Sequence, residues 1–355
     1  MPHIASPLLE SHFASQALLK EQLNARVESI ELDYELHYSE NKIVRDLLKK
    51  MLLDQISSLI SSALDDRKIS IMLVDIQNDF VLKDFALYAP GGENTITRNM
   101  ALLDAFNELI TEKPELITRF EIVTSQDAHI LGRDNTDKDA QIMAHAYGLD
   151  ATNAAIAKEQ QEMLPINPPE GSFGLHCMRG TVGADIAKPI EDRLKALEAM
   201  GINTFRFGKV TFSGPEAGML LKRGTLLSHS SEESIYDEVA LSYSAFFASR
   251  NYSKVLITGI CGDVCVQQAA EGLAQLFKRI ASASVAAVVD ACVHYLFPAG
   301  RANVEFSYRE KGVDVITSRY ICSNNPVVND SLYARLEVPV ASELREFKDH
   351  IPQLI

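Results

Sequence analysis

Short apolar runs alternate with stretches of helical periodicity after residue 69, and this alternation constrains the fold more than any other feature of the chain. The first run covers residues 69–74 and is rich in β-branched side chains. Similar runs occur at residues 120–124, 204–207, 254–258, 285–289 and 313–317. Helical patterns separate most of them, at residues 94–109, 190–200, 266–280 and 302–311. Buried strands joined by helices form a mainly parallel sheet, so the sequence predicts a three-layer α/β/α fold.

Residues 1–66 have a different pattern. They contain no Gly, and apolar side chains recur at helical spacing between residues 43 and 64. This predicts a helical N-terminal extension with one apolar stripe, followed by an α/β domain at residues 67–355. The polar face mixes Asp with Lys and Arg, unlike the uniformly basic face of a helix that lies on a membrane. We therefore expect the stripe to pack on the α/β domain or on another subunit.

Two polar segments interrupt the alternation, near residues 131–172 and 212–241. Both are longer than the connections that usually join strands and helices. We interpret them as insertions in the α/β domain that hold small helices or a lid.

The charge of the chain excludes several classes of partner. It has 34 Lys and Arg against 48 Asp and Glu in 355 residues, a formal net charge of −14. A surface this acidic repels phosphate backbones and anionic membranes, so we expect neither nucleic acid nor a membrane as a partner. No apolar run reaches the roughly 18 residues that span a bilayer. The first residues lack a secretory signal pattern and the five Cys lack a disulfide pattern, so we expect a cytoplasmic protein with free thiols.

Polar side chains stand where the predicted strands end. In an open parallel sheet, ligands bind beyond the carboxyl ends of the strands. The residues that follow the strands are Asp75, Asp127 with His129, Lys209, Cys265 and Asp290. Each is weak evidence alone, but together they bring acidic, basic, imidazole and thiol groups to one edge. The sequence therefore predicts an active site at that edge.

Cys265, Asp75 and Lys209 have the chemistry of a nucleophilic site. Cys265 follows a Gly-containing turn and opens an amphipathic helix, where the helix dipole favours the thiolate and free N–H groups suit an oxyanion. Burial at a strand end raises the pKa of a carboxyl such as Asp75, which suits it to exchange a proton with a thiol. Lys209 would balance the charge of both. The alternatives are a buried apolar thiol, a strand-end cap and a solvated surface amine.

Asp127, His129 and His176 form a candidate metal site. Asp127 and His129 are two residues apart at a strand end, so their side chains point to the same side. Two imidazoles and one carboxylate leave open positions on Zn²⁺ or Fe²⁺. The alternative is a polar cluster without a metal.

These residues lie in a series of motifs along the chain. The motifs are Asp75-Ile-Gln-Asn-Asp79-Phe80, Asp127-x-His129, His176-Cys177-x-x-Gly180-Thr181-x-Gly183-Ala184, Lys209, Tyr243-Ser244-x-Phe246 and Gly259-Ile260-Cys261-Gly262-Asp263-Val264-Cys265-Val266. In this order they resemble the motifs of nicotinamidases, which belong to the isochorismatase-like cysteine hydrolases. The resemblance covers about residues 68–320. The motif that begins with His176 is the most specific, because it helps to separate metal-dependent nicotinamidases from metal-free relatives.

The resemblance implies the isochorismatase-like α/β/α fold, a triad of Asp75, Lys209 and Cys265, and hydrolysis of nicotinamide to nicotinate and ammonia in NAD salvage. Cys265 would attack the carboxamide carbon after giving its proton to Asp75, and water would then hydrolyse the thioester. The backbone N–H groups of Cys261 and Cys265 would hold the oxyanion. The family has a cis peptide bond just before the first of these two donors.

The resemblance also implies how the pyridine ring is bound. Asp127, His129 and His176 would hold one divalent ion, which would bind the pyridine nitrogen. Zn²⁺ is expected in preference to Fe²⁺ or Mn²⁺. Aromatic residues flank the pyridine in the family, and Phe80 and Phe173 stand at those places.

Several residues differ from the family pattern. The usual second His of the Asp-x-His motif is missing, so His145 in the insertion is a candidate fourth ligand. The segment after Lys209 is longer than usual, which makes Lys222 a rival for the lysine of the triad. Gly262 stands where the family has Thr.

Two other functions stay open. One is a different hydrolase of the same superfamily, acting on another carboxamide, a ureido compound or isochorismate, although the metal motif argues against most of these. The other is a non-catalytic binding protein of this fold, against which the complete set of Asp75, Lys209 and Cys265 argues. The sequence also leaves open whether the chain forms a homo-oligomer.

Overall fold

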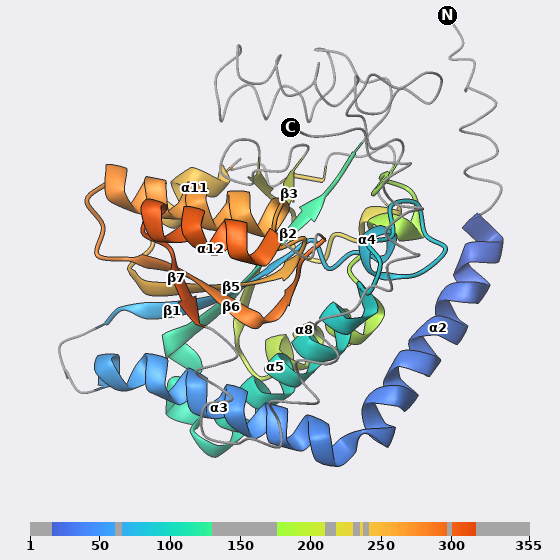
Figure 1. Ribbon diagram of the computed structural model, residues 1–355, viewed down its shortest axis with the longest axis horizontal. Coiled ribbons are helices and arrows are strands. Elements are labelled where there is room, and N and C mark those ends of the chain that lie inside the picture. Colours follow the sequence, from blue (N-terminus) through green and yellow to red (C-terminus); the bar gives the residue numbers. More distant parts are fainter. Residues whose placement is uncertain are drawn as a thin grey trace, which may run out of the picture.

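The structure is a computed structural model, and it describes residues 16–60, 66–129, 176–209, 218–229, 235–236, 241–296 and 300–316. In this part of the chain, one sheet lies between two helical layers (Figure 1). The predicted α/β fold with a mainly parallel sheet and helices before it is confirmed. The expected insertion at residues 131–172 lies outside the described residues, as does part of the one at 212–241.

The sheet has seven strands in the order β4-β3-β2-β1-β5-β6-β7. Neighbouring strands are parallel except β3 and β4. The strands are β1 Lys68–Val74, β2 Phe120–Asp127, β3 Asn203–Lys209, β4 Met219–Leu220, β5 Tyr252–Ile260, β6 Val285–His294 and β7 Asp314–Ile316. Because β1 is central and the chain then builds outward to both sides, the strand order reverses next to β1. Such a reversal is where open α/β sheets bind ligands.

The six predicted strands are all present, with ends that differ by a few residues. Two differences matter. β4 was not predicted, because a strand of two residues has no periodicity to detect. β6 continues to His294, so Asp290 lies within a strand and does not follow one, contrary to our prediction.

Helices cover both faces of the sheet (Figure 1). α5 (Glu93–Glu112) and α8 (Lys188–Ala199) lie on one face, and α11 (Cys265–Arg279) and α12 (Gly300–Lys311) lie on the other. All four were predicted. The short elements are α4 Asn78–Val81, η1 Pro114–Arg119, η2 Val182–Ala184, η3 Leu227–His229 and α10 Tyr243–Ala248. Within the described residues, no helix is both long and apolar enough to cross a membrane.

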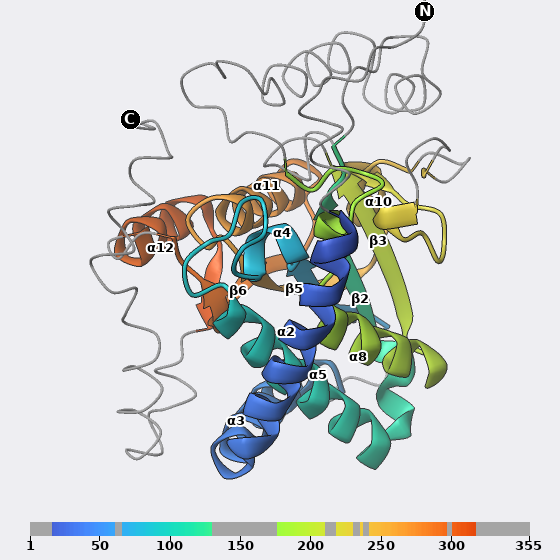
Figure 2. The ribbon, with the colours of Figure 1, turned by 90° about the vertical axis from the view of Figure 1, so that its right-hand side faces the viewer.

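The N-terminal segment forms two helices, α2 (Gln16–Leu36) and α3 (Tyr38–Ile60), on the side of α5 (Figures 1 and 2). Side chains of the apolar stripe are at most 2% exposed and join the same core as α5; they are Leu48, Met51, Leu52, Ile56 and Leu59. The stripe therefore packs on the α/β domain, which is one of the two outcomes that we expected.

A polar network fixes the same helices to the α/β domain. The Tyr34 hydroxyl donates to Asp104 Oδ2 at 2.9 Å, and Arg193 Nε donates to the other oxygen of Asp104 at 2.8 Å. Arg45 donates to the Tyr34 hydroxyl at 3.2 Å. Burial, with a contribution from Asp104, raises the pKa of Tyr34. The network spans α2, α3, α5 and α8, so it specifies how the four helices meet.

Because Leu52 is fully buried in this core, Leu52→Ala should lower the free energy of unfolding of the whole protein by about 2–5 kcal/mol. Lys50→Ala is the matched control, since Lys50 is exposed on the same helix. Urea denaturation followed by circular dichroism measures both. An unchanged main transition in Leu52→Ala would mean that α3 is not part of the cooperative unit.

The side chain of His294, at the end of β6, gives a pH-dependent prediction. Burial lowers the pKa of His294 to about 4, while a hydrogen bond to the Pro90 carbonyl opposes the shift. The unfolded chain therefore binds this proton at higher pH than the folded chain does, and stability is lost as pH falls from about 6.5 toward 4. The variant His294→Asn keeps a hydrogen-bond donor at this position but has no side chain that titrates in this pH range. The stability of the wild type relative to His294→Asn should fall by about 2 kcal/mol between pH 7.5 and pH 5. A pH-independent difference in urea denaturation would contradict this assignment.

Candidate active site

Side chains from four neighbouring strands meet at one edge of the sheet. β1 is followed by Asp75, β2 ends in Asp127, β3 ends in Lys209, and Cys265 opens the helix after β5. The structure thus brings together the three residues that the resemblance implies as a triad, next to a residue of the candidate metal cluster. Strand order alone accounts for this, because β3, β2, β1 and β5 are consecutive in the sheet.

The backbone at the end of β1 is closely constrained. Asp75 has a φ of 55°, a left-handed conformation that non-Gly residues seldom adopt, and its N–H donates to Ser125 O at 2.9 Å. On the other side, a Cβ on Gly259 would lie 2.0 Å from the carbonyl oxygen of Val74. Only Gly permits this approach, so β5 passes close enough for the turn after it to reach Asp75.

Lys209 lies between two carboxylates. Its Nζ is 2.8 Å from Asp75 Oδ2 and also contacts Asp127 Oδ1. Burial alone would lower the pKa of Lys209, but Asp127 and Asp75 outweigh it and hold that pKa well above its usual value. Burial raises the pKa of Asp75 to about 7, although Lys209 opposes the shift. Asp75 is therefore suited to take and return a proton near neutral pH.

Cys265 lies near this acid. The Asp75 carboxylate and the Cys265 thiol influence each other's pKa, and Cys265 is 7% exposed. Burial raises the pKa of the thiol well above its usual value, and the opposing charge of Lys209 does not reverse the shift. Burial therefore favours the neutral thiol at this position, whereas the start of the helix was expected to favour the thiolate. A neutral thiol needs a base in order to react, and Asp75 stands in that position.

The turn from β5 to α11 places the backbone of Cys261 beside that of Cys265. The peptide bond between Ile260 and Cys261 is cis, as the resemblance implies. The N–H groups of Val264 and Val266 both donate to the carbonyl of Cys261, at 3.1 and 3.0 Å. The first N–H groups of a helix have no intrahelical acceptor. This turn and helix start are therefore the place where an oxyanion could be held.

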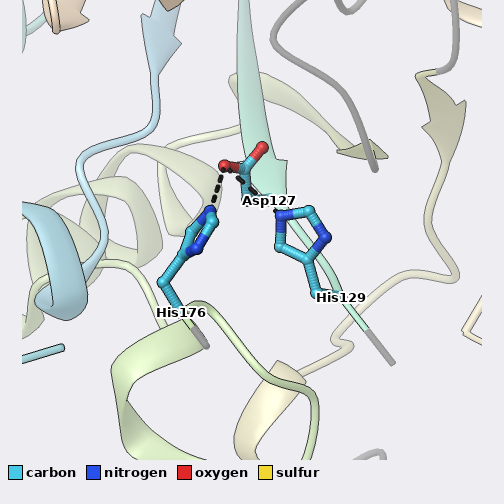
Figure 3. A group of neighbouring side chains, drawn as sticks. All are labelled: Asp127, His129 and His176. Atoms are coloured by element: carbon cyan, nitrogen blue, oxygen red, sulfur yellow. Dashed lines mark ion pairs between the residues drawn. The ribbon is translucent and has the colours of Figure 1, made fainter. Parts of the chain in front are cut away.

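Asp127, His129 and His176 form a buried cluster (Figure 3). Lys209 contacts its carboxylate member, Asp127. The Nε2 atoms of His129 and His176 lie 3.8 and 3.7 Å from Asp127 Oδ2, and ligand atoms from all three residues lie within 4.8 Å of one another. Burial would raise the pKa of Asp127, but Lys209 and the two imidazoles hold it well below its usual value. Burial lowers the pKa of His129 to about 4. Ionised carboxylates and neutral imidazoles are the forms that bind metals, so the cluster fits a divalent ion.

Gln77 holds the strand end that carries two of these ligands. Its Nε2 donates to the carbonyl of Asp127 at 2.8 Å, and its Oε1 accepts from the N–H of the same residue at 2.7 Å. Nε2 also donates to the carbonyl of Ala184 at 2.6 Å. One amide side chain thereby ties β2 to the motif that begins with His176.

Asp79 holds the other ligand loop. Its Oδ2 accepts from the N–H of Cys177 at 2.6 Å, next to His176. A Cβ on Gly183 would lie 2.2 Å from Oδ1 of Asp79, so the Gly of this motif leaves room for the carboxylate. Gln77 and Asp79 lie in the first of the motifs, but the sequence predicted no role for either. The one available signal was their position directly after an apolar strand.

The remaining candidates have different outcomes. Phe80 is 8% exposed, and its ring centroid lies 5.6 Å from that of His176, so it can form a wall of a site beside the metal cluster. Phe173 and His145 lie outside the described residues. Asp290 lies within β6 and accepts a hydrogen bond from the Tyr295 hydroxyl at 3.0 Å.

Lys222 does not share the position of Lys209. It lines a separate cavity of about 410 Å³ beside α8, together with Glu191 and Glu198. The lysine next to Asp75 is therefore Lys209.

No known family model matches the sequence, and no curated protein is significantly similar to it. Several solved structures are similar to this chain at low identity. The protein PnC1 from L. infantum, in complex with nicotinate, is 15% identical; the match covers 72% of this chain and 96% of that one, with a TM-score of 0.42. The nicotinamidase of Bacillus subtilis is 15% identical, with 70% and 100% covered and a TM-score of 0.42. The yeast nicotinamidase bound to the inhibitor nicotinaldehyde is 15% identical, with 70% and 99% covered and a TM-score of 0.41.

Proposed function

We propose that this protein is a nicotinamidase that hydrolyses nicotinamide to nicotinate and ammonia and so acts in NAD salvage. The observation that carries the proposal is the contact between two buried groups of residues. A thiol, a carboxyl and an ammonium group form the first, and the second is a carboxylate with two imidazoles. The first group is suited to acyl transfer and the second to a divalent ion beside the substrate.

In the first half of the reaction, Asp75 accepts the proton of the Cys265 thiol as sulfur attacks the carboxamide carbon. Lys209 balances the charge around Asp75 and the developing thiolate. The backbone N–H groups of Cys261 and Cys265 hold the oxygen of the tetrahedral intermediate, where fixed donors stabilise charge most effectively. When the intermediate collapses, Asp75 returns the proton to the leaving nitrogen. Ammonia departs, and the thioester of Cys265 remains.

In the second half, Asp75 takes a proton from water as water attacks the thioester carbon. The carbon–sulfur bond breaks, nicotinate forms, and the proton returns to Cys265. The cycle consumes one water and regenerates the neutral thiol. A pKa near 7 suits Asp75 to both directions of transfer.

Asp127, His129 and His176 would hold the metal ion, and Zn²⁺ fits two imidazoles and a carboxylate well. When bound, the ion supplies a Lewis acid that can take a heteroaromatic nitrogen as a ligand. The chain's own contribution is orientation: Phe80 stands beside His176 and can pack on a flat ring.

Replacing the nucleophile tests the chemistry. Cys265→Ala should lower ammonia release from nicotinamide by several orders of magnitude, because the covalent route is lost. Cys292→Ala removes another buried thiol, on β6, and should keep near wild-type turnover. The assay is run across a panel of small carboxamides and ureido compounds, with and without chelator. More than a few per cent of residual activity in Cys265→Ala would exclude its role, and turnover of another panel member instead of nicotinamide would assign a different hydrolase of this type.

Replacing a ligand tests the metal cluster. His176→Ala should lose most of the bound metal, measured by elemental analysis of the purified protein, and should raise KM for nicotinamide. His229→Ala is the control, since His229 is exposed on η3. Unchanged metal content in His176→Ala, or a wild type that binds no zinc, iron or manganese, would contradict the assignment.

A further inference from the structure

The turn that would hold the oxyanion is supported by β6 and α12 from its outer side. The N–H of Gly262 donates to the carbonyl of His294 at 2.6 Å, and the hydroxyl of Tyr308 donates to the carbonyl of Gly262 at 3.3 Å. Asp263 Oδ1 accepts from the N–H of Leu296 at 2.9 Å. Two consecutive residues of the turn are therefore bonded to chain segments that carry none of the proposed triad.

Gly262 is required by space and not by backbone conformation. Its φ lies outside the left-handed region that favours Gly, in which six other glycines of the described residues lie. A Cβ at this position would lie 2.6 Å from Cδ1 and Cε1 of the Tyr295 ring, and 2.6 Å from Cγ1 of Val293. The nicotinamidase motif has Thr at this position. In this chain the Tyr295 ring occupies space that a side chain larger than that of Gly would need.

The Tyr295 ring is itself held in place. Its hydroxyl donates to Asp290 Oδ1 at 3.0 Å. Asp290 lies where β6 is irregular: β6 advances from Val288 to Val293 while β5 advances only from Ile257 to Gly259. The extra residues of β6 bring the carboxylate within reach of the tyrosine. The position of the Tyr295 ring therefore depends on the irregular part of β6, and the ring in turn leaves space only for Gly at position 262.

We propose that Tyr295 is a positioning residue for the turn at residues 261–265, and that Gly262 and Tyr295 are an interdependent pair. The ring packs against the Cα of Gly262 and sets where the N–H groups of Cys261 and Cys265 stand. This inference rests on the proposed function, because it assigns those N–H groups to the oxyanion. Tyr295 acts through the turn and not on the substrate. Donors to an oxyanion must be fixed within fractions of an ångström, so a loosened turn should slow the chemical step more than it weakens binding.

Three variants test the pair by steady-state kinetics of ammonia release. Tyr295→Ala should lower kcat by at least about tenfold and leave KM within about twofold of the wild type. The loss should be smaller than the 10²–10³ typical of removing an oxyanion donor. Gly262→Ala should lower kcat similarly, because its methyl group displaces the turn from the ring. The double variant Gly262→Ala/Tyr295→Ala should have a higher kcat than Gly262→Ala, since loss of the ring removes its contact with the methyl group and leaves space into which Val293 Cγ1 can move. Tyr38→Ala, which removes an exposed tyrosine of α3, is the control.

A second readout separates the turn from the thiol. Alkylation of Cys265 by iodoacetamide displaces iodide and forms no oxyanion, so its rate should stay near that of the wild type in Tyr295→Ala. A parallel loss of alkylation and turnover would overturn the positioning role, because it would indicate general damage to the site. A kcat for Tyr295→Ala within twofold of an active wild type, or additive effects in the double variant, would overturn it as well. Absence of any Cys265-dependent ammonia release in the wild type would instead overturn the proposed function.

Discussion

The ammonium group of Lys209 holds the candidate site together. It lies between the carboxylates of Asp75 and Asp127, and its side chain is 1% exposed. Two carboxylates buried this close together would repel each other, and one would take up a proton if no cation stood between them. Lys209 affects the two carboxyls to different extents. The pKa of Asp127 is held well below its usual value, so Asp127 stays ionised as a metal ligand must be, while Asp75 keeps a pKa near 7. The proposed triad and the proposed metal cluster therefore share one charge balance.

The geometry of the site follows from strand order combined with a few side-chain clamps. Lys209, Asp127 and Asp75 come from three adjacent strands, and Cys265 follows a fourth. Parallel strands bring such groups to one edge but do not fix the loops between them. Gln77 supplies that constraint for the metal cluster by bonding both backbone groups of Asp127. Hydrogen bonds from outside supply it for the turn before α11.

The N-terminal helices are part of the same folded unit. The stripe of α3 is buried against α5 and adds to the apolar core on that face of the sheet (Figure 2). α2 also reaches the segment that follows α4. There the Nη2 atom of Arg26 lies 3.1 Å from Oδ2 of Asp84. Both side chains are exposed, so this ion pair contributes little stability. The buried contacts of Tyr34 and the stripe are what hold the extension in place.

The sequence by itself determined the class of fold and which polar residues follow the central strands. Apolar runs and helical periodicity are local patterns, and they are sufficient to predict a parallel sheet and the edge at which polar residues gather. Tertiary structure alone decided between Lys209 and Lys222, because the choice depends on a distance between strands far apart in the sequence. It also decided that burial raises the pKa of the Cys265 thiol, since burial is set by every element that packs around a group and not by the helix that carries it. Local pattern therefore specified which groups are present, and packing specified their charge and their partners.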